Sequence, residues 1–251
     1  MTSGIATSRS HALADLPWTA VAAHLAGDRR LIVPVGSCEQ QGPHLPLGAA
    51  TRVAERLADD LSCEFGVLRA PTLHYGVNPR AERDFAGTAG VGGKTLHRAL
   101  NELVSDWAGQ GVREFVFITA STHDPHVEAV ATVRVEGARV RVVSALSVDL
   151  SQFLDGGKGP EHAGEALTSL LLHLAPGVVR MDRARDFVLD AAEEACMRGL
   201  ERRLPAQSPG SVGEPTLATA EKGRKMYEHI LQKIRNKVFI APPADDEEED
   251  E

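Results

Sequence analysis

The stretch Leu31–Thr51, LIVPVGSCEQQGPHLPLGAAT, joins a short apolar run to a loop that carries polar side chains. Residues 31–35 have the length and composition of a buried strand in a parallel sheet. In open α/β sheets, ligands bind beside the loops that leave the carboxyl ends of the strands. The loop at 36–51 is therefore the first place where this sequence predicts a functional site, with Glu39 and Gln41 among its polar side chains.

The rest of the chain alternates short apolar runs with segments of helical periodicity, which is the pattern of a parallel sheet covered by helices. Strands are expected at 66–70, 115–118 and 140–143, and helices at 50–61, 95–107, 164–174 and 218–234. We predict one three-layer α/β domain with a mainly parallel central sheet. It spans residues 17–240, between an N-terminal tail (1–16) and an acidic C-terminal tail (241–251).

Length and composition narrow the class of protein. A chain of 251 residues with 43% hydrophobic content can bury the core of one large domain, and no apolar run is long enough to cross a bilayer. The first residues lack the apolar core of a signal peptide. The three cysteines are an odd number without zinc-finger spacing, which indicates reduced thiols. We therefore expect a cytoplasmic protein with no membrane partner.

The net charge of −8 comes almost entirely from the acidic run DDEEEDE at 245–251. The body of the chain is close to neutral and lacks the concentrated basic face that binding of nucleic acid requires. We therefore expect no nucleic-acid partner. The acidic run itself is expected to be a disordered, solvated tail, with a docking role as the less favoured interpretation.

Four motifs follow one another along the chain: GSCEQQGPHLPLGAAT (36–51), YG with DFAGT (75–88), EHAGEALTSLLLHLAPGVVRMD (161–182) and GEP with AEKG (213–223). Together they resemble the creatininase family, and within it most closely the creatininase-like peptidases associated with mycofactocin. The resemblance covers residues 17–235 and implies a creatininase-like fold, hydrolysis of an amide C–N bond in a small molecule or peptide, and assembly into a homo-hexamer.

The same resemblance places metal ligands in the first loop, where a dinuclear centre of the family activates water for attack on an amide. Glu39 stands at one ligand position. The positions of three further ligands are taken by Gln41, Ala50 and Ser121. A neutral amide, a methyl group and a hydroxyl cannot offset the charge of two divalent cations. We therefore expect the dinuclear site to be largely lost, and no metal cofactor.

A single divalent metal (Zn, Mn or Fe) is the alternative, held by a re-routed set of Glu39, His123, His126 and Glu165. Pro125 disfavours a helix through this stretch. The competing interpretation is that His123 and His126 lie in a loop and face solvent.

The string EHAGE at 161–165 supplies the expected catalytic group, Glu161, His162 and Glu165. The resemblance places the Glu-His pair beside the substrate, and a carboxylate near an imidazole in a cleft suits acid–base catalysis. The other interpretation is structural. In it Glu161 is an exposed carboxylate, and Glu165 stabilises the first turn of the helix that follows.

The expected substrate pocket contains Gln41, His44, Ser121 and Tyr75. His44 also suits a structural role, supporting the loop by hydrogen bonding. Cys38 could act as a metal-free nucleophile activated by His44 or His162, although most buried free cysteines are inert. The resemblance places Glu82, Arg83 and Asp84 where some members of the family carry substrate-facing residues, but an exposed charged loop is the favoured interpretation.

Three functions stay open on the sequence alone. The protein is a creatininase-like hydrolase, or a catalytically inactive relative that binds a small molecule or peptide, or a structural subunit of an assembly. Metal content separates the first from the others, because an unactivated amide is hydrolysed very slowly without the electrostatic stabilisation that a metal supplies.

Overall fold

A central sheet of five parallel strands organises the computed structural model, which describes residues 11–156, 161–197 and 204–240. The strand order is β1-β3-β2-β4-β5. β2 therefore lies in the middle, with β3 on one side and β4 on the other. The strands are β1 (His11–Ala12), β2 (Arg30–Pro34), β3 (Leu68–Arg69), β4 (Glu114–Thr119) and β5 (Arg139–Ser144).

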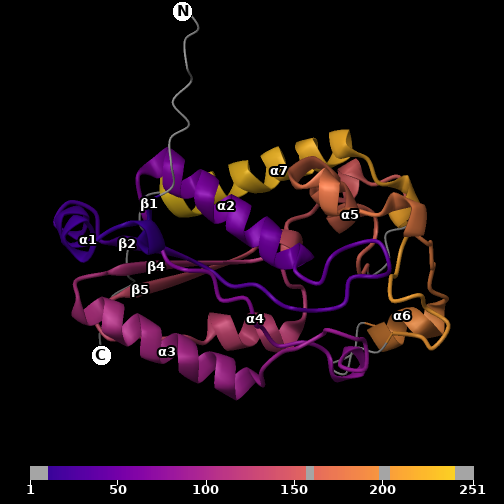
Figure 1. Ribbon diagram of the computed structural model, residues 1–251, viewed down its shortest axis with the longest axis horizontal. Helices are drawn as coiled ribbons and strands as arrows, with labels where there is room; N and C mark the ends of the chain where they lie inside the picture. Colours follow the sequence, from indigo (N-terminus) through magenta and orange to yellow (C-terminus); the bar gives the residue numbers. More distant parts are fainter. Residues whose placement is uncertain (1–10, 157–160, 198–203, 241–251) are drawn as a thin grey trace, which may run out of the picture.

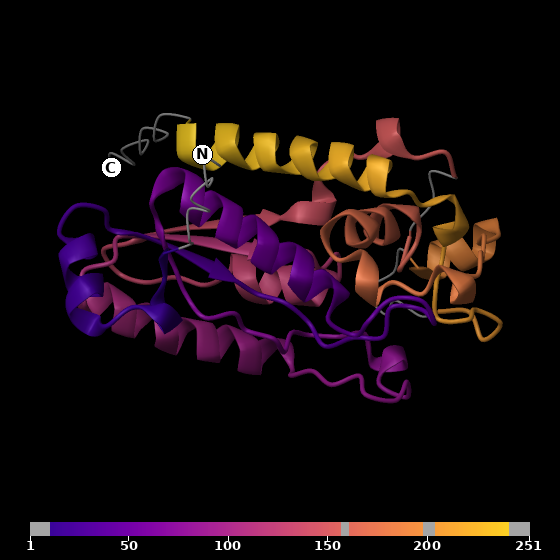
Figure 2. The same cartoon turned by 45° about the horizontal axis from the view of Figure 1, so that its top comes forward.

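Helices cover both faces of this sheet, so the predicted three-layer α/β fold is confirmed (Figures 1 and 2). Helices α2, α5 and α7 form one outer layer, and α3 and α4 lie across the opposite face. The helices are α1 (Trp18–Leu25), α2 (Ala49–Phe65), α3 (Gly93–Gly109), α4 (Asp124–Ala131), α5 (Glu165–Leu174), α6 (Ala191–Met197) and α7 (Ala220–Ile234).

The two cores follow from the alternation of side chains along the strands. In β4, Val116 and Ile118 pack with α2, α5 and α7, whereas Phe115 and Phe117 pack with α3 and α4. All four are completely buried. Because both faces of the strand meet helices, β4 is apolar at successive positions, which is why it reads in the sequence as a continuous apolar run.

The N-terminal boundary differs from the expected one. Residues 11–12 form β1 and pair in parallel with β3, and a 3₁₀ turn at Leu13–Asp15 follows. Residues 11–16 therefore belong to the folded domain and not to a tail. The acidic run at 241–251 lies outside the described residues. Within the described ranges, no helix has both the length and the apolarity that a membrane crossing requires.

The expected loop at 123–126 is wrong, because α4 begins there, at Asp124. Pro125 occupies the first turn of α4. An N–H in the first turn has no partner within the helix, so proline is tolerated there. The consequence is that His126 faces inward and is completely buried, and does not lie in a solvent-facing loop.

Candidate metal and active site

The site lies where the winding of the sheet changes direction. The crossover from β2 leads through α2 to β3 on one side, and the next crossover leads through α3 to β4 on the other side. The loop after β2 therefore leaves the sheet at a topological switch point, which is where open α/β sheets form a crevice. Glu39 lies in this loop and Ser121 follows β4. Because β2 and β4 are parallel neighbours, both residues lie at the same edge of the sheet, where the carboxyl ends of the strands meet.

Three buried side chains converge beside this edge: Glu39, Glu82 and His162. One ligand-type atom of each lies within 4.8 Å of those of the other two. The His162 Nε2 atom is 3.6 Å from a carboxylate oxygen of Glu82. In the part of the chain that the structure describes, no other three His, Cys, Asp or Glu side chains meet this closely.

The first two members of this triad are positioned by loops that are tied together. Asn78 donates from its side-chain amide to the carbonyl oxygens of Cys38 (2.8 Å) and Ala89 (3.1 Å). A backbone bond of 3.0 Å from Ala89 N–H to the Cys38 carbonyl adds to this tie. Glu82 ends a 3₁₀ turn, Arg80–Glu82, and is 1% exposed. The charged loop expected at 82–84 is therefore not uniformly exposed, because its first residue turns into the site.

His162 is positioned by the segment that precedes α5. Its backbone forms a two-way bridge with Val212, of 3.1 Å from His162 N–H and 2.8 Å from Val212 N–H. The next residue, Ala163, has a φ of 51°, an unusual value for a residue with a Cβ. This left-handed residue reverses the chain between His162 and the first turn of α5.

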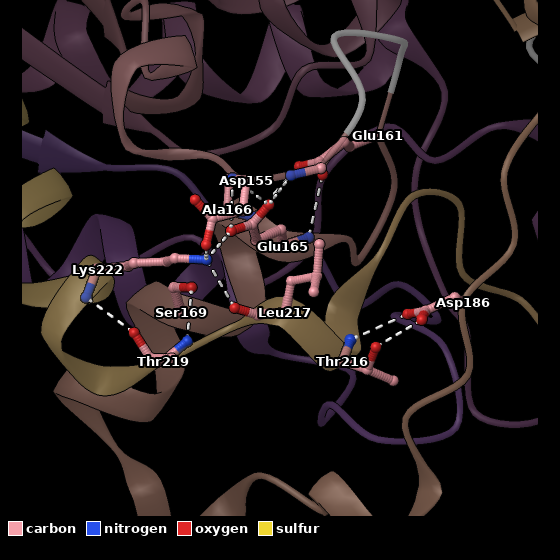
Figure 3. Close-up of polar contacts among 11 residues, drawn as sticks. Asp155, Glu161, Glu165, Ala166, Ser169, Asp186, Thr216, Leu217, Thr219 and Lys222 are labelled. Carbon is pink, nitrogen blue, oxygen red and sulfur yellow. Dashed lines mark hydrogen bonds and ion pairs between the residues drawn. The ribbon is translucent and has the colours of Figure 1, made fainter.

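Glu161 and Glu165 both accept hydrogen bonds from backbone N–H groups at or before the start of α5 (Figure 3). The Glu161 carboxylate accepts hydrogen bonds from the N–H groups of Glu165 (3.1 Å) and Ala166 (3.2 Å). These N–H groups lie in the first turn of α5 and have no partner within the helix. Burial raises the pKa of Glu161. The expectation of an exposed Glu161 is therefore wrong, and it is Glu161, not Glu165, whose side chain caps the first turn.

The Glu165 carboxylate is completely buried and forms an ion pair with Lys222 of α7. It also accepts from the backbone N–H groups of Asp155 and Gly156, at 3.1 and 2.9 Å. Figure 3 shows the Lys222 ammonium between Glu165, Asp155 and the Leu217 carbonyl. Burial lowers the pKa of Lys222, but the two carboxylates outweigh this effect and raise it.

The re-routed metal set does not come together. His126 uses both ring nitrogens within the protein, because Nδ1 accepts from Val77 N–H (3.1 Å) and Nε2 bonds to the Thr119 hydroxyl (3.0 Å). Burial lowers the pKa of His126 to about 4. His123 is buried, and its backbone N–H donates to the Ser121 hydroxyl at 3.3 Å. Of the four expected ligands, only Glu39 belongs to the buried triad.

Of the expected pocket residues, Gln41, His44 and Ser121 are buried and Tyr75 is exposed. The His44 Nε2 atom bonds to the Thr168 hydroxyl of α5 at 2.8 Å, and burial lowers the pKa of His44 to about 4. These contacts agree with a supporting role for His44. The Cys38 thiol donates to a backbone carbonyl, that of Gly87, at 3.4 Å.

Comparison with known proteins identifies the family to which this fold belongs. The family pattern described as "Creatininase: Creatinine amidohydrolase" matches residues 14–238. The chain belongs to the creatininase family. A mycofactocin precursor peptide peptidase of Mycobacterium ulcerans (strain Agy99) is 33% identical over 86% of this chain and 87% of its own length.

Two further creatininase-family proteins extend the comparison. The creatinine amidohydrolase of Pseudomonas putida is 27% identical over 92% of this chain and 97% of its own length. A solved mutant creatininase of Zn–Zn type is 26% identical, with a TM-score of 0.75 over 91% of this chain and 98% of that chain. One relative of known structure is thus described as a zinc form, which is a reason to ask whether the buried triad of this chain can bind a metal.

The triad of Glu39, Glu82 and His162 fits one divalent cation. It offers two carboxylates and one imidazole, which are donors that Zn²⁺ and Mn²⁺ accept, and all three side chains are buried. The sequence analysis named Glu82 only as a possible substrate-facing residue and missed it as a metal donor, because it stands 43 positions from Glu39 without a ligand motif of its own. It also missed Gln40, which contacts the triad. Only the resemblance of the flanking YG and DFAGT motifs pointed to this region.

Proposed function

We propose that this protein hydrolyses an amide C–N bond of a peptide or small molecule, with one divalent cation held by Glu39, Glu82 and His162. The observation that supports the proposal is the convergence of these three buried side chains at the switch point of a creatininase-family sheet. The donor set differs from the one expected, and a single cation replaces the dinuclear centre.

Charge favours one cation over two. The two carboxylates of Glu39 and Glu82, when ionised, offset the charge of one divalent ion, and His162 adds a neutral donor. A second cation would need further anionic donors. At the motif positions where the family resemblance implies ligands, this chain has Gln41, Ala50 and Ser121, none of which carries charge.

The residues around such a site would have different roles. When bound, the cation would supply Lewis-acid polarisation of an amide carbonyl and of an attacking water. Glu82 lies 3.6 Å from His162 Nε2, so these two side chains would face the same cation, and the backbone bonds with Val212 hold the segment that carries His162. Burial of the triad limits competing water and strengthens electrostatic interactions with a bound substrate. Glu161 and Glu165 act by fixing the segment that carries His162.

A peptide is the substrate class we favour. The relative that is 33% identical is described as a peptidase of a precursor peptide, and the relative that is 27% identical as a creatinine amidohydrolase. Both names describe cleavage of a C–N bond next to a carbonyl or its equivalent. A short peptide is therefore the first probe to use, and creatinine the second.

Metal stoichiometry tests the proposal directly. Full-length protein purified without chelator should carry about one Zn²⁺ or Mn²⁺ per chain by native mass spectrometry, and Glu82→Gln should remove it while leaving the circular dichroism unchanged. Glu128→Gln, which changes an exposed carboxylate of α4, is the matched control and should keep the metal. Two metals per chain, or a Glu82→Gln variant that retains its metal, would contradict the assignment.

Hydrolysis is tested separately. Incubation of the metal-loaded protein with short unmodified peptides and with creatinine, followed by mass spectrometry of the products, should reveal addition of water across one C–N bond. Loss of this activity in Glu82→Gln and not in Glu128→Gln is the expected result. A loaded protein that binds these compounds without product would support the inactive, ligand-binding alternative.

A further inference from the structure

The side chain of Gln40 lies inside the triad. Its amide nitrogen is 2.8 Å from His162 Nε2 and 3.4 Å from a Glu82 carboxylate oxygen. Gln40 is 4% exposed, so this contact is part of the interior and not of a mobile surface. A neutral amide NH₂ is a hydrogen-bond donor, and here it approaches the two acceptors that a cation would use.

The orientation of this amide is fixed by its other end. The Gln40 Oε1 atom accepts a hydrogen bond from the Gly42 N–H at 2.9 Å. If the oxygen and nitrogen of this amide exchanged places, the Gln40 NH₂ group would face the Gly42 N–H, and both groups are donors. Gly210 leaves room for this oxygen, because a Cβ at that residue would lie 2.7 Å from it. The nitrogen, and not the oxygen, of Gln40 therefore points at His162 and Glu82.

This arrangement leaves His162 Nε2 with two contacts that no single tautomer satisfies. The atom is 2.8 Å from the Gln40 amide nitrogen and 2.9 Å from the Gln40 backbone oxygen. A protonated Nε2 can donate to the backbone oxygen, but it then opposes the amide donor. An unprotonated Nε2 can accept from the amide, but it then faces the lone pairs of the backbone oxygen. A cation can bind only the unprotonated Nε2, and it would then need the lone pair that the Gln40 amide contacts, so the amide has to turn away.

We propose that Gln40 is a built-in competitor for the cation. Its amide nitrogen contacts His162 and Glu82 and has to turn away from both when a divalent cation binds. The inference rests on the proposed cation site. It adds that the affinity of this site is set by an internal side chain as well as by the three ligands, because loading must break the contacts of Gln40 with His162 and Glu82.

The experiment replaces the amide while keeping the length of the side chain. In chelator-stripped full-length protein, Gln40→Met should bind Zn²⁺ and Mn²⁺ about tenfold more tightly than the wild type, since the cation no longer displaces hydrogen bonds to a charged group. Gln40→Glu should bind more tightly still, because it removes the donor and adds a carboxylate. Gln110→Met, at an exposed glutamine after α3, is the control and should match the wild type.

Affinities are measured by competition with a chromophoric chelator, and folding by circular dichroism and thermal melting. If Gln40→Met fails to fold, Gln40→Leu carries the test, because it also removes the amide donor and adds no ligand. Equal or weaker cation binding by the folded variants would overturn the inference while leaving the cation site standing. Binding by no protein, wild type included, would instead refute the proposed site itself. Binding by the Gln40 variants alone would support the inference most strongly.

Discussion

Lys222 of α7 and Glu165 of α5 form an ion pair whose carboxylate is completely buried. The pair joins two helices that pack together in the same outer layer, and Asp155 extends it to the loop before α5, with 2.7 Å between Lys222 Nζ and the Asp155 carboxylate. Glu165 is thereby part of the frame that carries His162. This role differs from the acid–base chemistry that the sequence suggested for it.

Removing the ammonium should therefore destabilise the fold. We expect Lys222→Met to lower the free energy of unfolding by about 3 kcal/mol, because it leaves the buried Glu165 carboxylate without its counter-charge. Urea unfolding at pH 7 measures this. Lys225→Met is the matched control, since Lys225 is one turn from exposed Glu221, and a change within ~0.5 kcal/mol is expected. Equal effects of the two variants would contradict the assignment.

Glu161 should behave as a helix cap. Glu161→Ala removes the acceptor of two N–H groups at the start of α5, and we expect a loss of about 1 kcal/mol in the free energy of unfolding. Glu161→Gln keeps an acceptor and removes a buried charge, so its loss should be smaller. Urea unfolding measures both variants. A larger loss for the glutamine variant than for the alanine variant would count against capping.

The buried imidazole of His126 predicts sensitivity to acid. Its pKa lies at about 4 in the folded protein, below the ordinary 6.5, so the unfolded chain binds the proton first. The contribution of neutral His126 is fully present above pH 6.5 and is lost as the pH falls toward 4, by ~3 kcal/mol in total. His126→Gln should flatten the dependence of unfolding free energy on pH between 6.5 and 4.5. Parallel curves for variant and wild type would refute this.

The loop after β2 should accept a second metal when its ligands are restored. Gln41→His, Ala50→Asp and Ser121→His together supply two imidazoles and one carboxylate at the motif positions of the family. We expect the triple variant to bind one more Zn²⁺ per chain than the wild type, measured by native mass spectrometry. Ser121→His alone serves as the control and should not. An unchanged stoichiometry in a folded triple variant would mean that the loops no longer match the family geometry.

Assembly is predicted to follow the family resemblance, as a homo-hexamer that does not depend on the acidic tail. Deleting residues 241–251 removes seven like charges that repel one another. The number of subunits in the assembly should stay the same. Light scattering of the two proteins at equal concentration checks this. A monomer in both cases would exclude the hexamer, and a smaller assembly after truncation would give the tail a role in it.

The fold could be predicted because its signals are local. The apolar run at 115–118 lies within β4, and the periodic segment at 95–107 lies within α3. Pro125 misled the prediction because its effect depends on position. The same residue that disfavours the interior of a helix is accommodated in the first turn of α4.

The site could be predicted only in part, because its contacts join distant segments. Glu39 and His162 belong to motifs that the sequence displays, and both lie in the triad. Glu82 has no such ligand motif. Its side chain turns inward from the end of the 3₁₀ turn Arg80–Glu82, and Asn78 ties this loop to the loop that carries Glu39. The capping role of Glu161 likewise depends on the left-handed Ala163, whose φ no spacing pattern encodes.

The bridge between His162 and Val212 has a consequence for biosynthesis. His162 is aligned by backbone bonds to a residue 50 positions later, and Glu165 meets its counter-charge only at Lys222. During translation, the first loop and β4 leave the ribosome long before these partners exist. The donor set can be completed only when nearly the whole domain has been synthesised, so a nascent chain or a C-terminally truncated product holds Glu39 without an aligned His162.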